Sequence, residues 1–110
     1  MGISKTEIFS VKQNTMATLI KALGHPARIA IMEYLLKKNS CVCGDIVLEI
    51  GLAQPTISQH LKELKNVGLI QGTIDGTSVC YCINIKTFQK LNNYLSSISN
   101  KLTELKSTCC

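Results

Sequence analysis

Apolar positions repeat at the spacing of an α-helix near the beginning and at the end of the chain. The first stretch, about residues 5–23, ends at Gly24 and predicts an amphipathic helix. Pro26 then suits the first turn of a strongly apolar helix that runs to about Lys38. The last stretch, about residues 86–108, has apolar residues three and four positions apart, and its seam predicts a partner helix, most simply that of a second copy. The seam residues are Phe88, Leu91, Leu95, Ile98, Leu102 and Leu105.

The middle of the chain predicts two helices joined by a tight turn, at about residues 45–68. Asp45 is a candidate cap for a short helix from Ile46 to Ile50, which Gly51 would end. The next segment, LAQPTISQHLKELKNVGLI, has apolar residues on one helical face and polar residues on the other, up to Gly68. A short helix, a glycine turn and a second helix with a polar outer face are typical of a helix-turn-helix.

Two short β-branched runs, LIQGTI and SVCYCINI, follow at about residues 69–84. The residues DGTS join them, and Asp-Gly between such runs is a strong signal for a β-hairpin. A hairpin after a helix-turn-helix is a wing. We therefore expect an α+β, mainly α fold over residues 1–110: a single winged helix-turn-helix domain with a two-stranded wing and dimerisation helices at about 5–23 and 86–108.

Length and charge place few limits on function, but both are compatible with DNA binding. The chain has 110 residues, and no apolar run approaches the roughly 18 residues that span a membrane. Its start, MGISKTEIF, shows no long apolar segment or cleavage site, so we expect a cytoplasmic protein without membrane contact. The net charge of +5 is a mild indication of an anionic partner such as nucleic acid.

The amino-terminal half of the second helix of a helix-turn-helix lies in the major groove of DNA. Short polar side chains at these positions reach base edges and phosphates, and glutamine pairs with adenine through two hydrogen bonds. A dimer would set two such helices about one DNA turn apart and require a palindromic operator in double-stranded DNA. The candidate DNA-binding residues are Gln54, Thr56, Ser58, Gln59, His60 and Lys62.

Six cysteines occur as three close pairs: 41 with 43, 80 with 82, and 109 with 110. In a reducing cytosol they would remain thiols, which bind soft ions, although any single one could be a small buried apolar residue. In an extended segment, Cys41 and Cys43 lie on the same side, about 7 Å apart. An ion that draws both sulfurs together would pull on the chain where the helix-turn-helix begins. The two histidines, His25 and His60, have no second ligand at suitable spacing.

At these motifs the chain resembles the ArsR/SmtB family of winged-helix repressors, which release DNA on binding metal or metalloid ions. The resemblance rests on KALGHPARIAIMEYLL, CVCGDIV, LAQPTISQHLKELKNVGLI and the hairpin. It implies a homodimer paired through the first and last helices, with the residues named above reading DNA. Two departures are Ala53, where members often carry a capping serine, and a wing, GTIDGTS, without Arg or Lys.

The CVC pair resembles that of arsenic, antimony and cadmium sensors, in which a third thiolate completes the site. No cysteine lies among the residues directly after Cys43, so the third sulfur must come from elsewhere. Cys109 continues the apolar seam of the last helix and Cys110 lies beside it, so the two form a vicinal dithiol or merely end the seam. Strand alternation alone is enough to explain Cys80 and Cys82, so the predicted ligand set does not include them, but whether they take part in the site stays open.

The sequence therefore predicts a homodimeric repressor, and not an enzyme, that leaves its operator when trivalent arsenic or antimony binds thiolates of Cys41, Cys43, Cys109 and Cys110. Two alternatives stay open: a repressor that senses thiol oxidation, and a sensor of a soft divalent ion such as cadmium, lead or zinc. A cysteine-dependent enzyme is disfavoured, because no Cys-x-x-Cys stands at a strand-to-helix junction and no His and acidic residue accompany a cysteine.

Overall fold

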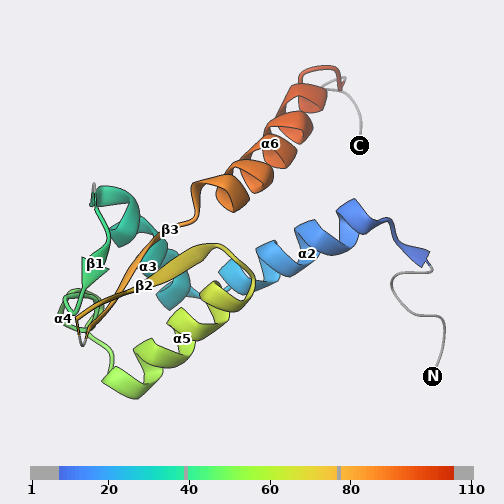
Figure 1. The fold of residues 1–110 in the computed structure, drawn as a ribbon. Helices are drawn as coiled ribbons and strands as arrows, with labels where there is room; N and C mark the ends of the chain where they lie inside the picture. Colours follow the sequence, from blue (N-terminus) through green and yellow to red (C-terminus); the bar gives the residue numbers. More distant parts are fainter. Residues whose placement is uncertain (1–7, 39, 77, 106–110) are drawn as a thin grey trace.

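The chain folds as a mainly helical winged helix-turn-helix, as the sequence predicts (Figure 1). The computed structural model describes residues 8–38, 40–76 and 78–105, and within them every side chain except those of Cys43, Asp75 and Ser78. The elements are α2 (Val11–Leu23), α3 (Pro26–Lys37), β1 (Val42–Cys43), α4 (Ile46–Ile50), α5 (Gln54–Asn66), β2 (Ile70–Asp75), β3 (Ser78–Ile83) and α6 (Ile85–Leu102). Helices α4 and α5 form the helix-turn-helix, and strands β2 and β3 form the wing.

Helix α2 begins at Val11, where a capping box sets its first turn, and residues 5–7 of the predicted range lie outside the described part of the chain. The Ser10 N–H donates to Gln13 Oε1 at 2.9 Å, and the Gln13 N–H donates to Ser10 Oγ at 3.0 Å. These two bonds satisfy backbone donors that a helix start otherwise leaves without a partner. The helix ends at Gly24, as predicted.

Helix α3 starts at Pro26, also as predicted, and His25 caps it. The Ala27 N–H donates to His25 Nδ1 at 3.0 Å. His25 thus has a local structural role, which agrees with its exclusion from the predicted ligands.

The sheet has one strand more than the predicted hairpin. Strands β2 and β3 pair antiparallel, as the Asp-Gly signal predicts, and β1 pairs antiparallel with the other edge of β3. Val42 is the Cα partner of Tyr81, and the side chain of Val42 is buried in the core. The segment before the helix-turn-helix is therefore extended, as expected, but it also belongs to the same sheet as the wing.

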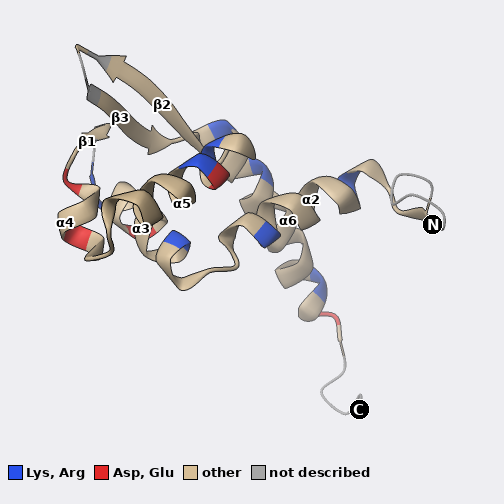
Figure 2. Cartoon of the chain, turned by 90° about the horizontal axis from the view of Figure 1, so that it is seen from below, with Lys and Arg blue, Asp and Glu red and all other residues tan. Residues whose placement is uncertain are grey.

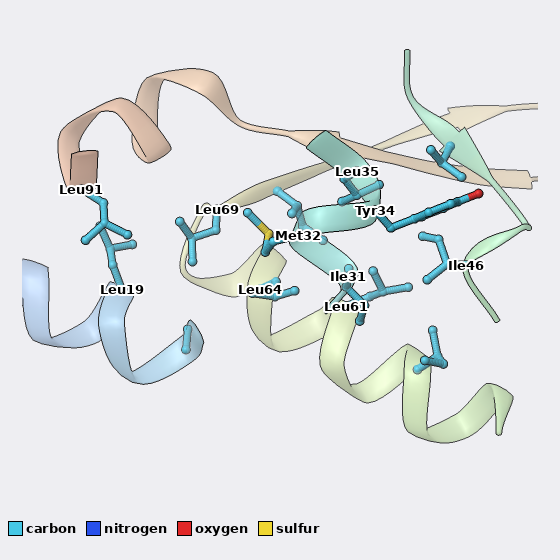
Figure 3. Close-up of a cluster of buried hydrophobic side chains, with 14 of the residues drawn as sticks. Leu19, Ile31, Met32, Tyr34, Leu35, Ile46, Leu61, Leu64, Leu69 and Leu91 are labelled. Atoms are coloured by element: carbon cyan, nitrogen blue, oxygen red, sulfur yellow. The ribbon is translucent and has the colours of Figure 1, made fainter. Parts of the chain in front are cut away.

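Helix α3 lies at the centre of the core and is covered by the other helices (Figure 3). Ile31 from α3, Leu64 from α5 and Leu69 before β2 have no exposed surface. Leu19 of α2 and Leu91 of α6 pack at one end of the same cluster. The apolar helix faces predicted from the sequence thus pack in one core around α3, and contacts with α3 hold α5 in position.

The distal parts of α2 and α6 extend beyond this core (Figure 1). Helix α6 buries Leu91, but its later seam residues Leu95, Ile98 and Leu102 are 48%, 40% and 57% exposed. The helix ends at Leu102, short of the predicted end near 108, and residues 106–110 lie outside the described part. Within the described ranges, no helix has the length and apolar character needed to cross a membrane.

Candidate nucleic-acid interface and cysteine cluster

A glycine turn orients α5 relative to α4. Gly51 has φ 83°, a left-handed conformation that glycine adopts at little cost, and its N–H donates to the Val47 carbonyl oxygen at 2.9 Å. Asp45 stands at the predicted cap position of α4, but its side chain makes no capping hydrogen bond. Ala53 at the start of α5 likewise provides none. The turn and the buried face of α5, rather than side-chain caps, therefore set the geometry of this unit.

Helix α5 presents a row of polar side chains on its outer face. Its inner face buries Ile57, Leu61 and Leu64. Five of the residues predicted to contact DNA are exposed on this helix: Gln54, Thr56, Ser58, Gln59 and Lys62.

Three of these side chains, those of Gln54, Ser58 and Gln59, already have partners on the same helix. Gln54 Nε2 donates to Ser58 Oγ at 2.8 Å, and Gln59 Nε2 donates to Glu63 Oε1 at 3.3 Å. Both bonds are exposed, so they can be exchanged at small cost for contacts with a base edge.

His60, the sixth predicted DNA-binding residue, points into the protein instead. Its side chain is only 8% exposed, Arg28 Nε donates to His60 Nδ1 at 3.1 Å, and the His25 ring lies 4.4 Å away between centroids. Burial lowers the pKa of His60, and the positive charges of His25 and Arg28 lower it further. A neutral, buried ring with an occupied Nδ1 positions α5 against α3 and does not face the outer surface, so we leave it out of the DNA-reading set.

The wing has little positive charge of its own. Figure 2 shows acidic residues on α4 and basic residues along α2, α5 and α6, and no Lys or Arg on the described parts of β2 and β3. Lys65 of α5 partly compensates, because its Nζ would lie 3.3 Å from a Cβ placed on Gly72 of β2. The Lys65 ammonium group therefore lies beside the base of the wing.

The structure brings together cysteines from two of the three pairs. Cys41, exposed, and Cys82, half-buried, are free thiols that line one cavity. The neighbouring Cys41 side chain raises the pKa of the Cys82 thiol, and burial adds to the increase. Cys80 is buried and disulfide-bonded, which departs from the expectation that the cysteines remain thiols, and its backbone lies opposite that of Cys43 in the sheet. The side chain of Cys43 and the whole of 109 and 110 lie outside the described residues.

A cavity of about 360 Å³ opens beside these two thiols. Leu35, Leu36 and Lys38 at the end of α3 line it, together with Ile83 and Ile85 near the β3–α6 junction. Among the side chains that the structure describes, no three His, Cys, Asp or Glu residues form a metal-binding group. Cys82 lies outside the predicted ligand set, although the repeated Cys-x-Cys spacing in two extended segments is a signal that could have indicated it.

Comparison with known proteins identifies a family over residues 25–71, which match the description "Bacterial regulatory protein, arsR family". An uncharacterised HTH-type transcriptional regulator of Methanocaldococcus jannaschii is 40% identical over 73 residues, 66% of this chain and 81% of that one. The arsenical resistance operon repressor of Staphylococcus xylosus is 29% identical over 84 residues, 76% of this chain and 80% of that one.

The fold is also found among solved structures. A homodimeric winged helix-turn-helix DNA-binding domain of Mycobacterium bovis, a possible ArsR-family transcriptional regulator, has a TM-score of 0.67 at 22% identity. The similarity covers 99% of this chain and 98% of that domain, so the arrangement of helices and wing is shared over almost the whole length.

Proposed function

Because the chain belongs to the ArsR family of bacterial regulatory proteins, we propose that it represses transcription as a homodimer and leaves its operator when trivalent arsenic or antimony binds cysteine thiolates. Family and fold make it a DNA-binding transcriptional regulator of the winged helix-turn-helix type, not an enzyme. The proposal adds the oligomer, the DNA-reading residues and the inducer to that statement.

The observation that carries the DNA-binding part is the exposed polar row on α5. Gln54, Thr56, Ser58 and Gln59 stand in the amino-terminal half of a helix of 13 residues whose opposite face is buried. In this position they read base edges in the major groove, and Lys62, one turn later, contacts a phosphate. Each bidentate pair contributes about 1–3 kcal/mol of discrimination between bases.

The apolar faces beyond the core support the homodimer. Leu95 and Ile98 continue the face of α6 that begins with buried Leu91, and they are 48% and 40% exposed. Lys12 of α2 lies over the ring of Tyr94 on α6, 5.6 Å from its centroid, so the two helices meet at the base of this face. A second copy would bury the rest of the face, and the related M. bovis domain is described as homodimeric. The two α5 helices would then read a palindromic operator.

Cys41 and Cys43 are the proposed thiolates nearest to the helix-turn-helix, and the similar S. xylosus protein is a repressor of an arsenical resistance operon. Cys41 is exposed, and only β1 and two further residues separate it from α4. An ion held here acts on the position of α4 and hence of α5. By linkage the ion binds the DNA-incompetent state more tightly, and a coupling of about 1–3 kcal/mol changes DNA affinity roughly 5- to 150-fold.

The test is a gel-shift titration on a duplex selected by this chain from a random library, with sodium arsenite added in strong reductant. We expect wild type to release the duplex, and the double variant C41S/C43S to bind DNA but not respond to arsenite. A C109S/C110S variant, matched in the number of thiols removed, measures the part played by the carboxy-terminal pair.

Three outcomes would contradict the proposal. Release by an oxidant but not by arsenite favours the redox alternative, and release by cadmium alone favours a divalent-ion sensor. A normal arsenite response of C41S/C43S removes these two cysteines from the site.

A further inference from the structure

Two Cys-x-Cys segments lie side by side in the sheet. Strand β1 pairs antiparallel with β3, so that Val42 is opposite Tyr81 and Cys43 is opposite Cys80. Continued by one position, the same register sets Cys41 opposite Cys82, and both residues line the same cavity, which agrees with it. The motif that leads into the helix-turn-helix therefore faces the strand that forms the wing.

The geometry of a sheet makes Cys82 the sulfur nearest to Cys41. Cβ atoms of directly opposed residues are about 4.5–5.5 Å apart, whereas positions i and i+2 of one strand are about 7 Å apart. Two free thiols at opposed positions of paired strands can therefore converge on one ion with little movement of the backbone.

We propose that Cys82 supplies the third sulfur of the arsenic site, together with Cys41 and Cys43, within one subunit. The inference rests on the proposed function, because it completes the ligand set of the same inducer. Arsenite enters as arsenous acid, with three hydroxyl groups on arsenic. Three As–O bonds break and three As–S bonds form, each thiol proton leaves with a hydroxide as water, and no atom changes its oxidation state.

The surroundings of the two thiols suit a soft, neutral ligand. Arsenous acid is uncharged, and the cavity beside Cys41 and Cys82 has apolar walls from Leu35 and Ile83, with Lys38 at its edge. Among the described residues that line this cavity, none is acidic. A hard divalent cation would find no oxygen ligand from a carboxylate here, whereas a thiophilic centre finds two free thiols that line the same cavity.

The position of Cys82 extends the effect of the ion from the helix-turn-helix to the dimer. Cys41 is followed by β1 and α4, while Cys82 is followed, after Ile83 and Asn84, by α6. One ion would clamp the start of the helix-turn-helix to the start of the helix that carries the exposed apolar face. In a homodimer such a clamp changes the separation of the two α5 helices, which a palindromic operator requires to be fixed.

The experiment uses the reduced full-length chain and measures alkylation of each thiol by iodoacetamide with mass spectrometry, with and without sodium arsenite. We expect arsenite to protect Cys82 together with Cys41 and Cys43, and to leave 109 and 110 as reactive as before. Protection of the carboxy-terminal pair with unchanged alkylation of Cys82 would overturn the inference, although arsenite would still act as the inducer.

Variants give a second readout that separates the two proposals. We expect C82S to bind arsenite at least tenfold more weakly than wild type in a direct titration, as C41S does, and C109S/C110S to bind it normally. Equal arsenite affinity for C82S and wild type would contradict the assignment of Cys82 as a ligand but leave the proposed function intact. If wild type binds no arsenite, both the proposed function and the assignment of Cys82 are wrong. Because Cys41 is exposed and alkylation is measured on wild type, the test holds even if C82S does not fold.

Discussion

Replacing His60 by alanine should destabilise the protein without removing a DNA contact. The His60 ring is 8% exposed, accepts a hydrogen bond from Arg28 at 3.1 Å, and lies 4.4 Å from the His25 ring. A hydrogen bond to a charged group contributes about 1.5–3 kcal/mol, and its loss leaves the Arg28 Nε without its partner. We expect H60A to lower the free energy of unfolding by about 2–3 kcal/mol.

The neighbouring Gln59 provides a matched control, because its side chain is exposed on the outer face of the same helix turn. For Q59A we expect a stability change within about 0.5 kcal/mol, but a loss of DNA affinity of about 1–3 kcal/mol. The two variants should therefore show opposite profiles, although they alter adjacent residues.

Thermal unfolding and DNA binding at low temperature measure the two effects separately. At equal protein concentration, the Tm of H60A should fall by about 8–12 °C, at about 4 °C per kcal/mol for a domain of this size. Its DNA affinity at 10 °C, where the variant is folded, should stay within threefold of wild type. A Tm like that of wild type with a tenfold loss of DNA affinity would mean that the His60 ring faces DNA.

The other predictions concern pH, the core and the dimer. Because burial and nearby positive charge lower the pKa of His60, the unfolded chain binds its proton more readily. Stability should therefore be complete above about pH 6.5 and decline as the pH falls below it, and H60A should show a shallower decline in Tm. Leu64 has no exposed surface, so L64A should lose about 3–5 kcal/mol in urea unfolding, whereas L48A, at a side chain 85% exposed, should stay within about 0.5 kcal/mol. Charges on the exposed face of α6, in L95E/I98E, should convert a dimer into folded monomers in light scattering after gel filtration, and a persistent dimer would place the interface elsewhere.

The order and type of the elements could be predicted from the sequence because the signals are local. Helical spacing, Pro26, Gly51 and the Asp-Gly turn depend on residues a few positions apart, and each element found in the structure except β1 follows from one of them. The limits of α2 were less predictable, since the capping box of Ser10 and Gln13, rather than apolar spacing, sets its start. Five of the six predicted DNA-contacting side chains are exposed on α5 because the polar face of an amphipathic helix is also a local property.

The tertiary structure decided what each ambiguous side chain faces. His60 is one of the polar residues of α5, yet the packing of α5 on α3 turns its side chain towards Arg28 and His25. The contact between Cys41 and Cys82 depends on β1 adding to β3, and the register of strands far apart in the chain is not encoded in either segment alone. The sequence by itself thus determined a winged helix-turn-helix fold and three pairs of neighbouring cysteines. Only the fold decided which thiols meet, because that pairing is a long-range contact set by the packing of the sheet.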